Sequence, residues 1–169
     1  DLSADLVHLE KIFQEESPSA FMFVSVLGLV PEMERVVNLC EKYDVILLED
    51  TCESMGSKYR DRKLGTFGRM SSFSTFFGHH ISTIEGGFVS TDDKDLYDIL
   101  VSIRAHGWDR DLDTEKQIEL QQDWDVSTFN SLYTFYYQGF NVRATDLQAY
   151  IGLTQIDKLD AWGVRREYN

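Results

Sequence analysis

The sequence has few cations, few cysteines and no long apolar run. Only 16 Lys and Arg side chains stand against 29 Asp and Glu side chains, so the formal net charge is −13. Because binding to nucleic acid or to an anionic membrane surface depends largely on Lys and Arg, this balance argues against both kinds of partner. It leaves room for a specific pocket that holds a phosphate group.

Cysteine is nearly absent. Cys40 and Cys52 lack the spacing of metal ligands and are too few for a disulfide framework, so we expect two buried thiols in a reducing compartment. No apolar segment approaches the roughly 18 to 20 residues of a membrane span, and no signal-peptide pattern opens the chain. These features predict a cytoplasmic protein with no metal site and no membrane partner.

The hydrophobic content is sufficient for a folded domain. The 169 residues are 43% hydrophobic, which predicts a sizeable core and one domain or a large part of one. Both ends of the chain are helix-compatible, and the stretch from Arg165 onward has no helix stop signal. We therefore expect a fragment of a longer protein.

Hydrophobic periodicity predicts alternating strands and helices. The predicted helices span residues 2–16, 31–43, 94–104 and 146–160, and the predicted strands span residues 21–26, 45–49, 71–77 and 87–91. The first two strands with the helix between them form a β-α-β unit, which implies parallel strands and a right-handed crossover. The expected fold class is α/β, with a mostly parallel sheet flanked by helices.

Residues 107–140 lack a clear period and are predicted to be mostly loop. A connection of this length is uncommon unless it is functional or packs on a partner.

Asp50 follows directly after the second predicted strand. Ligands of parallel sheets bind beyond the carboxyl ends of the strands, so its position makes Asp50 a candidate site residue. The alternative is an Asp that caps a turn at the end of a strand.

Several short motifs follow one another in a fixed order. They are Ile46 to Gly56, Leu64 to Gly68, Ser71 to Ser74, Glu85 to Gly87, Arg104 to Gly107 and Asn141 to Ala149. In this order they resemble the sugar aminotransferase family of the fold-type I pyridoxal-phosphate (PLP) enzymes, over nearly the whole chain. The resemblance implies that residues 1–169 are the central fragment of the large PLP-binding domain, without the N-terminal cofactor-loop segment and the C-terminal small domain.

The resemblance assigns cofactor-binding roles to four residues. It implies that Asp50 keeps the pyridine nitrogen protonated and that Ser74 donates to the cofactor phosphate. It implies that Asn141 reaches across a homodimer to the phosphate of a neighbouring subunit's cofactor, which places the cofactor site at the subunit interface. Glu53 matches a position that faces the cofactor ring. The alternatives are a turn or strand serine for Ser74 and, for Glu53, a solvated carboxylate on the first turn of a helix.

His79 departs from the family pattern. The family carries a lysine five positions after the serine, and that lysine binds the cofactor covalently and moves protons. Histidine cannot form the covalent link, but it can act as general base and acid at the same place. The resemblance therefore narrows to the sugar-nucleotide 3-dehydratases, which bind pyridoxamine phosphate (PMP) without a covalent link and use L-glutamate to regenerate it. The alternative for His79 is drift in an inactivated aminotransferase, and the adjacent His80 is a weaker candidate.

Two branches of such dehydratases differ in their need for an iron–sulfur cluster on four cysteines. The stretch after Trp108 has no cysteine, so the resemblance favours the cluster-free branch, which removes the C3 hydroxyl of a GDP-4-keto-6-deoxymannose-type substrate. Trp108 and Arg110 are candidate contacts for the anionic sugar nucleotide, because Arg forks onto phosphate oxygens. An exposed aromatic ring and a solvated cation are the alternative.

Other readings of the function remain open at this point. The nucleotide could be CDP instead of GDP. The chain could belong to a sugar-nucleotide 4-aminotransferase that tolerates histidine, or to a non-catalytic relative that only binds cofactor or ligand.

Overall fold

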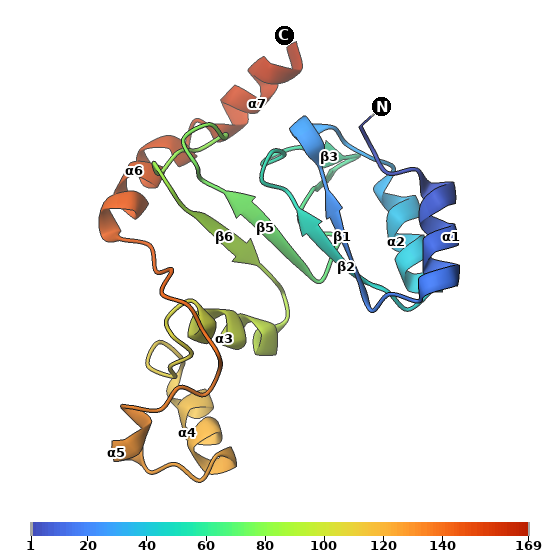
Figure 1. The fold of residues 1–169 in the computed structure, drawn as a ribbon. Coiled ribbons are helices and arrows are strands. Elements are labelled where there is room, and N and C mark those ends of the chain that lie inside the picture. The colour runs from blue at the N-terminus through green and yellow to red at the C-terminus, as the bar shows by residue number, and fades with distance from the viewer. Residues whose placement is uncertain (1, 169) are drawn as a thin grey trace. The chain divides into compact units, whose positions relative to one another are not determined.

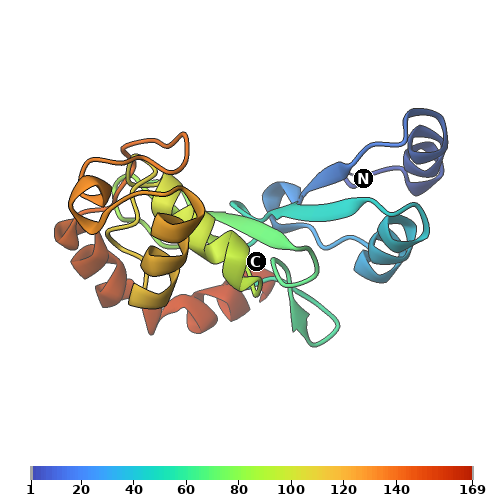
Figure 2. The same cartoon turned by 90° about the horizontal axis from the view of Figure 1, so that it is seen from below.

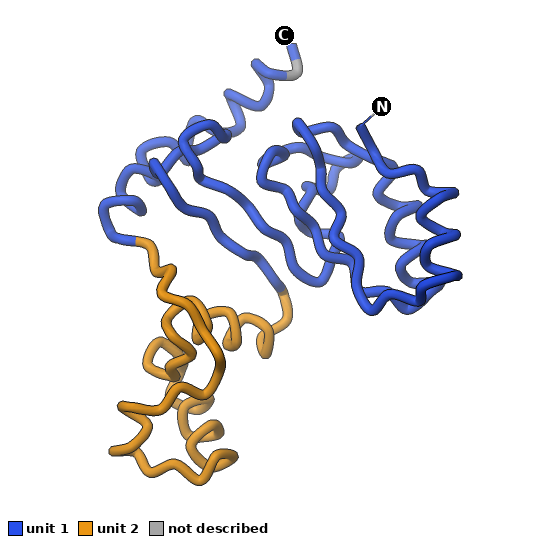
Figure 3. Tube along the Cα trace, viewed as in Figure 1, with its two compact units in different colours: residues 1–91, 145–169 blue, residues 92–144 orange. Residues whose placement is uncertain are grey.

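The computed structural model describes residues 2–168, and the chain forms two compact units. The first unit combines residues up to 91 with residues from 145 onward, and the second comprises residues 92–144 (Figure 3).

The first unit contains a four-stranded sheet in the order β1-β2-β5-β6 (Figure 1). Its strands are β1 (Ala20–Val24), β2 (Ile46–Asp50), β5 (Met70–Ser74) and β6 (Gly87–Ser90). β1, β2 and β5 run parallel, as predicted, whereas β6 is antiparallel to β5. The loop between β5 and β6 contains no helix, and a parallel return would need a longer crossover.

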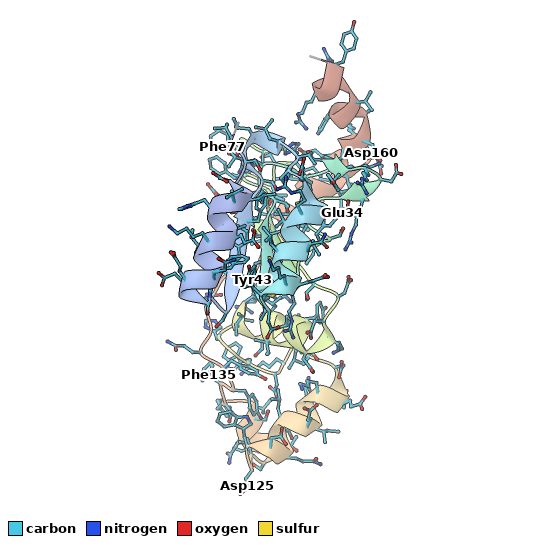
Figure 4. All side chains as sticks on the ribbon, turned by 90° about the vertical axis from the view of Figure 1, so that its right-hand side faces the viewer. Glu34, Tyr43, Phe77, Asp125, Phe135 and Asp160 are labelled. Atoms are coloured by element: carbon cyan, nitrogen blue, oxygen red, sulfur yellow. The ribbon has the colours of Figure 1, made fainter. Side chains whose placement is uncertain are left out.

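Two helices pack beside β1 and β2, as Figure 1 and Figure 2 both show. They are α1 (Leu6–Glu16) and α2 (Met33–Lys42), and the short 3-10 helix η1 (Val26–Gly28) lies between β1 and α2. The core between helices and sheet consists of Leu9, Phe13, Phe23, Met33, Val36, Cys40, Val45, Leu47 and Leu64. Tyr43, labelled in Figure 4, ties α2 to α1, because its hydroxyl accepts from Gln14 Nε2 at 2.7 Å and donates to Glu10 Oε1 at 3.0 Å.

A buried carboxylate fixes the turn that precedes β5. Glu49 in β2 is only 1% exposed. Its Oε1 accepts from the backbone N–H groups of Phe67 and Gly68, both at 2.6 Å, and its Oε2 accepts from Gly65 N–H at 2.7 Å. Buried charges are tolerated when they are hydrogen-bonded in this way. Between β2 and this turn lies a small hairpin, β3 (Lys58–Tyr59) and β4 (Arg62–Lys63), which periodicity did not predict.

The second unit holds α3 (Lys94–Ile103), α4 (Thr114–Asp123) and α5 (Thr128–Ser131). Its core is the cluster of Val101, Leu112, Leu120 and Tyr136. The prediction of a loop over most of residues 107–140 was wrong for α4 and α5. α4 has a single buried residue, Leu120, so its sequence carries no apolar stripe, but Asp113 caps it by accepting from Lys116 N–H at 2.9 Å.

The last predicted helix is divided in two. α6 (Asp146–Ile156) begins with a capping box formed by Thr145 and Gln148, and α7 (Leu159–Tyr168) follows after a break. Among the helices of residues 2–168, none is long and apolar enough to cross a membrane.

Candidate functional site

Three of the predicted site residues come from the carboxyl ends of neighbouring parallel strands. Asp50 is the last residue of β2 and Ser74 is the last residue of β5. The two strands pair in parallel with Asp50 beside Ser72, so their carboxyl ends meet at one edge of the sheet. His79 lies in the loop that leaves β5 at this edge.

Asp50 is held in its charged form by its surroundings. Partial burial acts to raise the pKa of its carboxyl, but hydrogen bonds from Cys52 and Ser72 and the nearby His79 imidazole outweigh burial and lower the pKa below its usual value. The Cys52 backbone N–H donates to Asp50 Oδ1 at 3.1 Å. This bond is an Asx turn, so Asp50 does cap a turn, as the alternative interpretation states. The turn does not exclude a site role, because Asp50 also presents a charged carboxylate at the edge of the sheet.

The loop between β5 and β6 is closed by two threonines. Thr75 Oγ1 and Thr83 Oγ1 lie 2.6 Å apart, and the Thr83 N–H donates to the Thr75 carbonyl at 2.8 Å. Gly86 adopts φ +143°, and a Cβ there would lie 2.8 Å from Thr75 Oγ1, so the glycine is required beside the pair. In the sequence, His79 lies midway between Thr75 and Thr83.

Ser74 and His79 are both anchored within this loop. The Phe76 N–H donates to Ser74 Oγ at 3.2 Å, a contact that uses the hydroxyl oxygen as acceptor and leaves its proton to donate elsewhere. The His79 N–H donates to the Phe76 carbonyl at 3.0 Å, and the two rings meet edge to face at 5.9 Å. The His79 side chain is half-buried, which suits an acid–base group that must meet a ligand.

A pocket of about 440 Å³ opens beside His79. It is lined by Phe77, His79, His80, Ser82, Gln155, Trp162, Arg165 and Arg166. Burial lowers the pKa of His80 below its usual value, and Arg166 and His79 add to the shift. His80 Nδ1 is buried without a hydrogen-bond partner in the described part of the chain, and Phe77, labelled in Figure 4, is 70% exposed at the tip of the loop.

Glu53 belongs to the same edge but not to a helix. Residues 51–54 form turns, so the alternative of a carboxylate on the first turn of a helix was wrong. Its Oε2 accepts from the Leu27 N–H at 2.6 Å, and Leu27 has φ +55°. Glu53 therefore stabilises a strained turn after β1, and its charge acts on the His80 side chain.

The other predicted contacts lie in the second unit. Asn141 is exposed and forms an isolated antiparallel bridge with Ala105. Trp108 is half-buried, and its ring stacks on Phe135 at 5.3 Å. Arg110 lies over the Trp108 ring with Cζ 3.8 Å from the centroid, and it donates to the Leu132 carbonyl. Arg110 is exposed, as the solvated-cation alternative expects, although it also contacts Trp108 and Leu132, and the substrate roles of Trp108 and Arg110 stay predictions.

Sequence reasoning missed several residues near His79. Ser72 contributes to the lowered pKa of Asp50, and its place opposite Asp50 follows only from the strand register. Arg165 and Arg166 line the pocket from α7, about 85 positions after His79 in the sequence. Hydrophobic periodicity carries no information about a contact over that distance. The pair of adjacent arginines was the one visible signal.

The donor set of the first unit fits a pyridoxal-type cofactor. Asp50 supplies a charged carboxylate for a pyridinium N–H, and Ser74 supplies a hydroxyl for a phosphate. His79 supplies an imidazole from the same edge. Within residues 2–168, no group of three or more His, Cys, Asp or Glu side chains is placed to hold a metal ion.

Comparison with known proteins agrees with this fold. A model of the DegT/DnrJ/EryC1/StrS aminotransferase family matches residues 1–169. The chain is 39% identical over 168 residues to the GDP-4-keto-6-deoxy-D-mannose 3-dehydratase of Yersinia pseudotuberculosis, a match that covers 99% of this chain and 42% of that protein.

Solved structures extend the likeness. A mutant of GDP-4-keto-6-deoxymannose-3-dehydratase with bound GDP-perosamine superposes with a TM-score of 0.86 at 37% identity, over 98% of this chain and 42% of that one. The same enzyme with a trapped PLP-glutamate geminal diamine gives a TM-score of 0.80 at 35% identity, over 94% of this chain and 40% of that one. These neighbours confirm the predicted fold class, and the chain spans about two fifths of the length of the relatives it matches.

Proposed function

Because the chain belongs to the DegT/DnrJ/EryC1/StrS aminotransferase family, we propose that it is the central part of the cofactor-binding domain of a PLP/PMP-dependent sugar-nucleotide 3-dehydratase. The proposed substrate is a GDP-linked 4-keto-6-deoxymannose, and the product is a 3,6-dideoxy-4-keto sugar. One observation carries the proposal. His79, which cannot bind the cofactor covalently, stands where the loop from β5 meets the charged Asp50.

The bound cofactor would supply an amine for the C4 ketone and a ring that accepts electrons. His79 then moves the protons, removing one from the cofactor's C4′ carbon and delivering one to the C3 oxygen as it departs. Its half-buried side chain is accessible to a bound ligand, while the backbone bond to Phe76 holds it in place.

The remaining contacts hold the cofactor. Asp50 keeps the pyridine nitrogen protonated, and its lowered pKa ensures that the carboxylate is charged at neutral pH. Ser74 donates its hydroxyl proton to the phosphate. Glu53 faces the cofactor ring from the turn that it anchors at Leu27, and Asn141 of a second copy completes the phosphate site in a homodimer.

The partners follow from the same reaction. L-Glutamate is the proposed amino donor, which the PLP-glutamate adduct trapped in the related dehydratase supports. Trp108 and Arg110 are proposed to meet the sugar nucleotide, since a stacked Arg–Trp pair offers both a cation and an aromatic face. We place the enzyme in the cytoplasm, where nucleotide sugars and reduced thiols are found together.

Product analysis tests the proposed reaction. The full-length protein is incubated with L-glutamate and with GDP- or CDP-linked 4-keto-6-deoxy sugars, and the products are identified by mass spectrometry. We expect a 3-deoxy-4-keto sugar from the GDP-linked substrate. An amino sugar would instead assign a 4-aminotransferase, and a protein that binds neither cofactor form in an absorbance titration would be a non-catalytic relative.

Substitution of His79 tests its role. We expect His79→Lys to abolish dehydration and to create a covalent link to the cofactor that borohydride makes permanent and mass spectrometry locates. His80→Lys is the matched control, because it adds the same amine one residue away and is expected to give no such adduct. A natural protein that already retains its cofactor after borohydride treatment would refute the proposal.

A further inference from the structure

Helix α6 contacts the His79 loop through one face. Gln148, Gly152 and Gln155 are spaced i, i+4 and i+7, so they lie on the same side of the helix. A Cβ on Gly152 would lie 3.2 Å from Thr83 Cγ2, so the glycine lets the helix approach the threonine pair that closes the loop. α6 has no buried residue, and two of its polar side chains form hydrogen bonds to the loop.

Gln155 bonds both backbone groups of one loop residue. Its Oε1 accepts from the Ser82 N–H at 3.1 Å, and its Nε2 donates to the Ser82 carbonyl at 2.7 Å. The same Nε2 donates to the Ile151 carbonyl of its own helix at 2.9 Å, which fixes the side-chain amide in the required orientation. Ser82 is three residues after His79, so this contact restrains the half of the loop that follows the imidazole.

Gln148 secures the end of the same half-loop. Its Nε2 donates to the Glu85 carbonyl at 2.7 Å. Its Oε1 accepts from the Thr145 N–H at 2.8 Å as part of the capping box, so the side chain is itself held by the helix terminus. The Thr83 hydroxyl also lies 2.9 Å from the Glu85 carbonyl, which ties this anchor to the threonine pair.

We propose that Gln155, supported by Gln148, is a positioning residue that sets the place of the His79 imidazole. The inference rests on the proposed dehydratase function, because it assumes that the position of the His79 imidazole matters for the reaction. The segment before His79 is held by Ser74 and the Phe76 carbonyl, and the segment after it is held by α6. The amide of Gln155 offers both the acceptor for the Ser82 N–H and the donor for the Ser82 carbonyl.

Two variants break the contact in different ways in the full-length protein. Gln155→Met keeps the length of the side chain and removes both bonds to Ser82, whereas Gln155→Glu keeps the acceptor for the Ser82 N–H and turns an oxygen toward the Ser82 and Ile151 carbonyls. We expect kcat for dehydration to fall about 10- to 100-fold in both variants, because small misplacements of a reacting group cost rates of this order. KM for the sugar nucleotide and the affinity for PMP are expected to change by less than about 3-fold, because the Gln155 amide is already engaged by Ser82 and Ile151.

A double substitution separates positioning from a general structural role. In single-turnover assays of residual dehydration, Gln155→Met is expected to cause no further loss once His79 is replaced by Asn. Thr154→Val is the matched control, because Thr154 Oγ1 bonds the same Ile151 carbonyl without contacting the loop, and its kcat should remain that of the natural protein.

Each outcome decides the inference. Additive losses from Gln155→Met and His79→Asn, or an unchanged kcat in Gln155→Met, would overturn it. If Gln155→Met does not fold, as judged by its melting temperature and PMP titration, the comparison passes to Gln155→Glu, which must then show reduced kcat at unchanged KM. A natural protein that forms no 3-deoxy product refutes the proposed function instead, so the two failures are distinguishable.

Discussion

Replacement of Glu49 by Gln is expected to destabilise the protein strongly while preserving side-chain shape. The amide oxygen can accept the bonds from Phe67 and Gly68, which share one carboxylate oxygen, but the amide nitrogen then faces the Gly65 N–H. A buried donor without a partner costs about 1–3 kcal/mol, and loss of charge weakens each remaining bond by about 1 kcal/mol. Because a neutral amide is easier to bury than a carboxylate, part of this loss is offset, and the free energy of unfolding should fall by about 2–4 kcal/mol.

Urea unfolding followed by circular dichroism measures this change. Glu34→Gln serves as the control, because Glu34 is 56% exposed and its ion pair with Arg60 at 2.9 Å is worth about 0–1 kcal/mol. A loss below about 1 kcal/mol for Glu49→Gln, or one equal to that of the control, would refute the assignment of Glu49 as the anchor of this turn.

The remaining predictions concern Asp50 in the site and Cys40 in the core. Asp50→Asn should lower kcat about 100-fold, since an amide cannot hold the pyridinium charge, and steady-state assays check this. Because hydrogen bonds and His79 hold the pKa of Asp50 below its usual value of about 3.9, the stability that its charge contributes is present above that pH and is lost as the pH falls through the lowered pKa. The melting temperatures of Asp50→Asn and the natural protein should therefore converge in acid, and a constant difference down to pH 2 would contradict this. Burial, aided by Glu41, raises the pKa of Cys40 to about 11, so iodoacetamide should label this thiol at pH 8 far more slowly in the native than in the unfolded protein. Its contribution to stability is full below about pH 8.5 and is lost as the pH rises toward 11, and equal labelling rates in the two states would show that the thiol is not protected.

The first two strands of the sheet were predictable because they form short, mostly apolar runs. The runs that became β1 and β2 need no tertiary information to be recognised, and their parallel pairing followed from the intervening helix. α4 was not predictable in this way, since only Leu120 is buried and the signal of the helix lies in its cap. β3 and β4 are two residues each, too short for any period.

The site residues that lie close together in the sequence were predictable, and those that come together only on folding were not. Asp50 and Ser74 end two neighbouring parallel strands, and His79 follows Ser74 in the next loop, so all three lie at the same edge of the sheet. The positions of these residues in the sequence were enough to predict this. The bond between Ser82 and Gln155 joins residues 73 positions apart, and its partners are ordinary polar side chains at helix and loop positions. From the sequence, Glu49 is a strand residue before Asp50, and only the folded structure shows that three backbone N–H groups converge on its carboxylate.

The loop from Thr75 to Thr83 has a consequence for how such chemistry changes in evolution. The loop is held by the threonine pair, two glutamines of α6 and backbone groups, and none of these hydrogen bonds uses the side chain at position 79. A lysine or a histidine can therefore occupy the same place without a new fold. If the proposed function holds, one substitution at this position would change the reaction while the contacts that hold the loop stay the same.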